Sequence, residues 1–73
     1  MTQTTYRLNG TINTREITTE RFAEYLLDLH FLKDAGENIK ITSDANFEFG
    51  RNWSVLLVER ETKRGTVKTV FKR

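Results

Sequence analysis

Apolar and polar residues alternate near the start of the chain, over residues 5–12. Tyr6, Leu8 and Ile12 fall on one side of an extended chain, and polar residues fall on the other side. A period of two residues is typical of a strand with one buried face. Gly10 lies on the apolar side, where a glycine can mark a bulge or a close backbone approach. The pattern predicts one half-buried strand over residues 5–12.

The period then changes to that of a helix. Thr18 or Thr19 can act as the N-cap, and Gly36 suits the left-handed conformation that follows many helix ends. We therefore expect a helix that begins near Thr18 or Thr19 and ends near Asp34 or Ala35. One arc of its surface carries an apolar stripe, made of Phe22, Tyr25, Leu26, Leu29 and Leu32.

Strand-like patterns return after the helix. Residues 39–42 and 47–49 predict two short strands. Residues 53–60 predict the strongest strand, because a run of apolar residues is typical of a strand in the middle of a sheet. Residues 66–72 predict a final strand that forms a hairpin with the preceding one. Turns are expected at residues 43–46, 50–52 and 62–65.

These elements predict an α+β fold in the order β-α-β-β-β or β-α-β-β-β-β. Short connections favour antiparallel pairing, so we expect a mostly antiparallel sheet of four or five strands. One helix would cover one face of this sheet as a two-layer sandwich, and the other face would be left to solvent or to a partner. The 73 residues suffice for one small α+β domain, residues 1–73.

Composition narrows the class of protein. The chain has no cysteine, which excludes disulfides and thiolate metal sites. It has neither the apolar segment of a signal peptide nor an apolar run of the roughly 20 residues that a transmembrane helix needs. We therefore expect a cytoplasmic protein without a membrane partner.

Candidates for catalysis are scarce. His30 is the only histidine, and it has no cysteine or serine partner at a spacing typical of a nucleophilic site. His30 and Asp34 are four residues apart, but a metal site would need more nitrogen or thiolate ligands than the chain contains. We expect no catalytic residue, no metal site, no cofactor and no enzymatic activity.

Two apolar residues of the expected helix lie outside its core stripe. Leu27 and Phe31 are four residues apart and so contact each other at the edge of an acidic arc. One interpretation is that the loop at residues 36–38 or the N-terminal arm covers them, or that the helix end frays so that Phe31 and Leu32 turn inward together. The other is a partner-binding patch with a charged rim. The rim would consist of Glu20, Glu24, Asp28 and Asp34.

Charge is divided unevenly along the chain. Residues 1–50 carry five basic and eight acidic residues, a net charge of −3, whereas residues 51–73 carry seven basic and two acidic residues, a net charge of +5. Such asymmetry bears on the choice of partner. Carboxylates spaced four apart, such as Glu20, Glu24 and Asp28, are commonly a solvated helix face, and they can also compete with nucleic acid for a basic groove.

In its small size, its lack of cysteine and catalytic groups, and the acidic ridge Glu20-Glu24-Asp28, the chain resembles the small inhibitors that phages and mobile elements use against bacterial defences, anti-CRISPR proteins among them. The net charge of +2 departs from the strongly acidic nucleic-acid mimics of that class. The resemblance therefore implies inhibition by occupying a protein surface rather than by full mimicry of DNA.

The basic C-terminal hairpin supplies an alternative, a direct DNA- or RNA-binding module. Its cations are Arg60, Lys63, Arg64, Lys68, Lys72 and Arg73. Arg60, Lys68 and Lys72 would converge with Arg7 and Lys40 on the sheet face away from the helix. Lysines on a terminal strand also have a structural purpose, since they prevent edge-to-edge pairing. A homodimer closed through Leu27 and Phe31 is compatible with either function.

Overall fold

The computed structural model describes residues 1–44 and 53–73 of the chain. This part of the chain forms a small α+β fold with one helix and a five-stranded antiparallel sheet. Its elements are β1 (Thr2–Tyr6), β2 (Ile12–Glu16), α1 (Thr19–Asp34), β3 (Asn38–Ser43), β4 (Val55–Thr62) and β5 (Gly65–Lys72). The predicted fold class is confirmed, with two strands before the helix rather than one.

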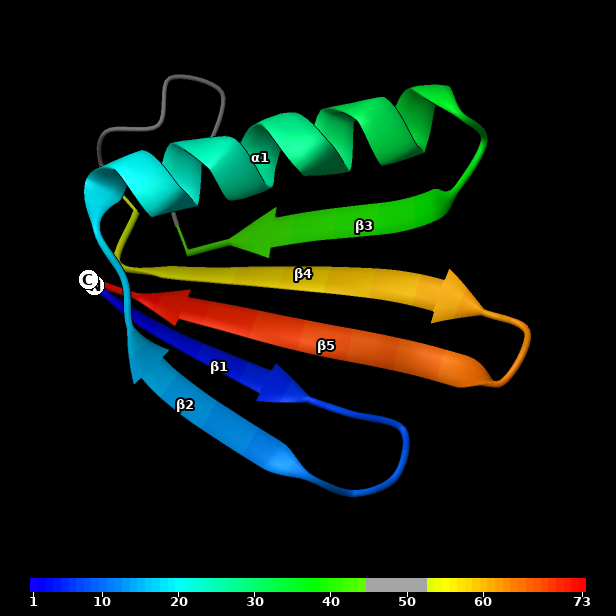
Figure 1. Ribbon diagram of the computed structural model, residues 1–73, viewed down its shortest axis with the longest axis horizontal. Helices are drawn as coiled ribbons and strands as arrows, with labels where there is room; N and C mark the ends of the chain where they lie inside the picture. The colour runs from blue at the N-terminus through cyan, green and yellow to red at the C-terminus, as the bar shows by residue number, and fades with distance from the viewer. Residues whose placement is uncertain (45–52) are drawn as a thin grey trace.

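The strands lie in the order β2-β1-β5-β4-β3, and every neighbouring pair is antiparallel (Figure 1). The first and last strands of the chain, β1 and β5, are therefore neighbours in the middle of the sheet. The helix α1 lies beside β3, and β2 forms the opposite edge (Figure 1). Within the described residues, α1 is neither long enough nor apolar enough to cross a membrane.

The prediction of a single strand over residues 5–12 is wrong. β1 ends at Tyr6, and the chain reverses before β2 begins at Ile12. Gly10 has φ of +86°, and its N–H donates to the carbonyl of Arg7 at 3.0 Å. The Asn9 side chain accepts from the N–H of Thr11 at 3.0 Å. An Asn-Gly pair is a strong turn signal, and here its local hydrogen bonds override the alternation of apolar residues.

The helix follows its sequence signals closely. The Thr18 hydroxyl accepts from the Arg21 N–H at 3.2 Å, which satisfies one of the unpaired donors of the first turn. At the other end, Gly36 adopts φ of +93° and donates to the Lys33 carbonyl at 3.0 Å. Only a residue without Cβ adopts this conformation at little cost. The predicted helix is therefore confirmed, as Thr19–Asp34.

The remaining strands agree with prediction where they are described. β3 and β5 match the strands expected at residues 39–42 and 66–72, whereas β4 begins at Val55 and continues to Thr62. The strand expected at residues 47–49 and the turn at 50–52 lie outside the described residues. The turn expected at 43–46 is described only at its first two residues, and the first of these still belongs to β3.

The core lies between α1 and the sheet. The Phe22 ring packs against the rings of Trp53 and Phe71, with centroids 5.3 and 4.9 Å apart. The Tyr25 ring also packs on Phe71, at 4.9 Å. Rings at these separations contribute more than their buried area alone. The buried apolar residues are Phe22, Leu29, Ile39, Trp53, Leu56, Val58 and Phe71.

Candidate functional site

Leu27 and Phe31 lie on the outer side of α1, where more than half of each residue is exposed to solvent. Their side chains are 56 % and 62 % exposed, whereas Phe22 and Leu29 on the inner side are 7 % and 6 % exposed. The interpretation in which a loop or the N-terminal arm covers the pair is therefore wrong. The N-terminal residues belong to β1 within the sheet, and Gly36 begins the turn into β3.

Helix geometry explains why this pair is exposed. At about 100° per residue, positions 20, 24, 27 and 31 fall on one line along the helix. That line is opposite the stripe that contains Phe22 and Leu29. Glu20 and Glu24 thus precede Leu27 and Phe31 along the same ridge. We call these four residues, together with Asp28 and Asp34, the outer-helix surface.

The carboxylates of the outer-helix surface have different surroundings. Glu24 forms an ion pair with Arg21 at 3.5 Å, and Asp34 lies 3.6 Å from His30. All four of these side chains are about two-thirds exposed, so such pairs stabilise the fold little and leave most of the negative field in place. Asp28 stands on the flank of the ridge.

Asp28 also borders two hollows on the sheet side of the helix. Gln3 and Tyr25 line both of them, and the Gln3 side chain accepts a 3.3 Å hydrogen bond from Arg15. Burial raises the pKa of the Tyr25 hydroxyl, an effect that a hydrogen bond with Thr69 partly opposes. Asp28 therefore lies between the outer-helix surface and these hollows, so of the four predicted rim residues it is the one nearest the sheet.

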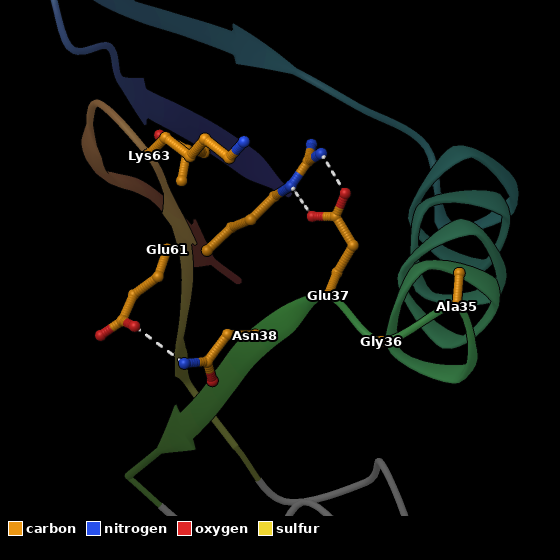
Figure 2. Close-up of a pocket in the computed structure, with 8 residues that line it drawn as sticks. Ala35, Gly36, Glu37, Asn38, Glu61 and Lys63 are labelled. Atoms are coloured by element: carbon orange, nitrogen blue, oxygen red, sulfur yellow. Dashed lines mark hydrogen bonds and ion pairs between the residues drawn. The ribbon is translucent and has the colours of Figure 1, made fainter.

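The basic residues of the hairpin are not brought together. Every second residue of a strand faces the same side, so Arg60 shares a face with buried Leu56 and Val58. This is the helix side of the sheet, where Val58 and Arg60 line a hollow with Leu29 and Leu32 of α1. Its Nε and Nη2 atoms donate to the two carboxylate oxygens of Glu37 at 2.7 and 3.0 Å (Figure 2). The expected convergence of Arg60 with Lys68 and Lys72 on the open face is therefore wrong.

The other cations are scattered. Lys40 and Lys68 lie on either side of Glu59 in the sheet register, which interrupts their positive field. Lys72 is paired with Thr2 and Val55 at the other end of β5. The guanidinium of Arg73 lies 4.3 Å from the centroid of the Trp53 ring, a cation–π contact. Lys63 and Arg64 form the exposed turn between β4 and β5, and Arg7 lies in the turn after β1.

The Glu37–Arg60 pair, which the sequence analysis did not find, lines a hollow of about 650 Å³ at the C-terminal end of α1 (Figure 2). Asn38 in the same hollow donates to Glu61 at 2.8 Å. The four polar side chains thus form two separate pairs, Glu37 with Arg60 and Asn38 with Glu61. Glu37 and Arg60 are 23 positions apart, and neither residue belongs to a motif that indicates their contact.

Three carboxylates elsewhere in the fold have a lowered pKa. For Glu37, the hydrogen bonds from Arg60 are the main cause. For Glu16, the main cause is the hydrogen bond from the Thr2 hydroxyl, and the N-terminal amino group adds to it. For Asp44, it is two backbone N–H groups at the start of β4. These charges are compensated within the fold, whereas the outer-helix surface presents its charges to solvent.

No cluster of three or more histidine and carboxylate side chains suited to a metal ion occurs among residues 1–44 and 53–73. Comparison with protein-family models, with curated proteins and with solved structures gave no match.

Proposed function

We propose that this protein is a non-enzymatic binding module that acts by occupying a macromolecular surface through its outer-helix surface. The supporting observation is the exposure of Leu27 and Phe31 on the side of α1 opposite the core. A large apolar side chain gains about 1.5–3 kcal/mol when it moves from full exposure to full burial. Two such side chains on a rigid helix can anchor an interface, with the carboxylates as its rim.

The charge of the rim indicates the chemistry of the partner. Glu20 and Glu24 follow the same ridge as the apolar pair, so a complementary partner would offer an apolar pocket with basic residues beside it. Basic surfaces are typical of proteins that handle nucleic acid. We propose that the partner is a bacterial effector that targets nucleic acid, and that the protein is an anti-CRISPR-like inhibitor from a phage or mobile element, acting in the cytoplasm.

Affinity capture from bacterial lysates tests this proposal. The wild-type chain should retain a nucleic-acid-targeting effector, and Leu27→Ala with Phe31→Ala should lose it. Tyr6→Ala with Val55→Ala is a matched control, because those two side chains are also exposed but lie on the open sheet face. The control pair should retain the effector.

A kinetic measurement then tests the role of the rim. Glu20→Lys with Glu24→Lys should lower the association rate more than it raises the dissociation rate, because exposed charges chiefly steer encounter. Equal capture by wild type and by the Leu27/Phe31 variant would contradict the proposal. Capture that depends on the open-face pair instead would also contradict it.

A further inference from the structure

The edge strand β2 has free backbone hydrogen-bonding groups in a regular pattern. Next to it, the Arg7 N–H donates to the Thr11 carbonyl at 2.9 Å, and the Ile17 N–H donates to the Met1 carbonyl at 2.9 Å. The odd-numbered residues of β2, Asn13 and Arg15, therefore direct their backbone hydrogen bonds to β1. It follows that the N–H and C=O groups of Ile12, Thr14 and Glu16 point away from the sheet.

β2 is only lightly protected as an edge. It is an exposed five-residue strand with two charged residues, Arg15 and Glu16, but it contains neither proline nor lysine, and no other described element covers it. The opposite edge is different. β3 contains Lys40, and Lys33 of α1 lines a hollow with Ile39 and Ile41 at that edge. In Figure 1, α1 lies beside β3, whereas β2 has no neighbour on its outer side.

We propose that β2 is a homodimerisation edge, which pairs antiparallel with β2 of a second copy about a two-fold axis at Thr14. In this register Thr14 lies opposite Thr14 of the second copy, and Ile12 lies opposite Glu16. These are the three residues whose backbone groups point outward, so each would form a hydrogen-bonded pair. The axis is perpendicular to the sheet, so the two sheets would join as one with both helices on the same side.

Side chains are compatible with this register. Thr14 already shares a hydrogen bond with Thr4 at 3.1 Å, and a hydroxyl with one donor and two acceptor sites can extend this row to Thr14 of the second copy. On the helix side, Asn13 would lie opposite Arg15 of the second copy, where its amide oxygen can accept from the guanidinium. No two like charges face each other within β2, which removes the commonest electrostatic obstacle to strand pairing.

This edge is separate from the outer-helix surface. Leu27 and Phe31 project from α1 away from the sheet, so pairing through β2 would leave them accessible. A dimer would present two such surfaces to a partner and gain avidity wherever the partner is itself multivalent. The proposal does not depend on the proposed function, because it predicts self-association in the purified protein.

Sedimentation equilibrium of the purified full chain tests the proposal, over roughly 10 µM to 1 mM, a range that detects weak association. The wild-type chain should show a concentration-dependent monomer–dimer equilibrium. Amide hydrogen exchange of Ile12, Thr14 and Glu16 should slow as the dimer forms, and that of Ile41 should not. A monomer across the whole range would overturn the proposal.

Thr14→Pro is the sharpest variant, because it removes an N–H that the monomer does not use for its own sheet. The dimer loses this donor twice, so its dissociation constant should rise roughly tenfold or more. Ile41→Pro is the matched control: it removes an outward N–H from the other edge and should leave the dimer intact. A folded Thr14→Pro chain that still dimerises like wild type would overturn the proposal.

A charge exchange provides a second test that does not depend on proline. Asn13→Arg would place a guanidinium opposite Arg15 of the second copy and should weaken the dimer. Adding Arg15→Glu to that variant should restore it, since opposite charges then face each other. A dimer that is lost in Leu27→Ala with Phe31→Ala, but is unaffected by the β2 variants, would assign self-association to the helix and overturn the β2 proposal.

Discussion

Removing Leu27 and Phe31 together should leave the protein folded. The double substitution Leu27→Ala with Phe31→Ala deletes side chains that are 56 % and 62 % exposed, so the fold covers only 44 % and 38 % of their surfaces. Both lie on the side of α1 opposite the buried residues. The perturbation therefore removes few internal contacts.

The expected loss of stability follows from the covered fractions. Full burial of a Leu or Phe side chain is worth about 1.5–3 kcal/mol, so the covered parts of the two together contribute about 2 kcal/mol. Alanine is the better helix former, which returns about 0.5 kcal/mol or more. The net loss should be about 1–1.5 kcal/mol. In a domain of this size, 1 kcal/mol lowers the melting temperature by about 4–8 °C.

Thermal melting followed by circular dichroism provides the measurement, and Leu29→Ala provides the contrast. Leu29 lies on the same helix but is 6 % exposed, so its truncation should cost about 2–5 kcal/mol. The total stability of a 73-residue domain is about 4–11 kcal/mol. Leu29→Ala should therefore melt far below the Leu27/Phe31 variant. If the two variants melted together, Leu27 and Phe31 would be part of the core and the proposed binding site would be wrong.

Three further predictions concern other parts of the molecule. Thr18→Ala should lower the free energy of unfolding by about 1 kcal/mol through loss of the helix cap, whereas Thr18→Asp should be nearly neutral; urea titration distinguishes these outcomes. The pKa of Glu37 is lowered by Arg60 from its ordinary value of 4.5. The stability that the Glu37–Arg60 pair contributes is therefore complete above pH 4.5 and is lost as the pH falls through the folded-state pKa of Glu37. Thermal melts at several pH values should show a smaller loss of stability at low pH in Glu37→Gln than in wild type. Purified protein should give no gel shift with DNA or RNA at low salt; a shift that Lys63→Glu with Arg64→Glu abolishes would favour the nucleic-acid alternative.

Local sequence signals determined the helix. Thr18 marks the start of the helix and Gly36 marks its end. The spacing of the apolar residues determines which side of the helix packs on the sheet. The same spacing places Leu27 and Phe31 outside the core stripe, so the principal candidate site was predictable from sequence. These features depend on contacts within a few residues, which is why a period and two end signals suffice to locate them.

Local signals also misled where two of them competed. Tyr6, Leu8 and Ile12 alternate as a strand does, yet Asn9 and Gly10 between them form a turn. Backbone hydrogen bonds and the positive φ of Gly10 determine the outcome. The turn at Asn9 and Gly10 divides this segment into the β1–β2 hairpin, which supplies the second strand before the helix.

The tertiary structure alone decided strand order, and strand order decided which charges meet. The pairing of β1 with β5 joins the two ends of the chain, and no local pattern encodes a contact across that separation. The same packing pairs Arg60 with Glu37, so Arg60 does not join the other basic residues of the hairpin. It also leaves β2 at an edge with outward backbone groups. Sequence periodicity assigns a side chain to a face, whereas the neighbour on that face depends on long-range pairing that the whole chain must form together.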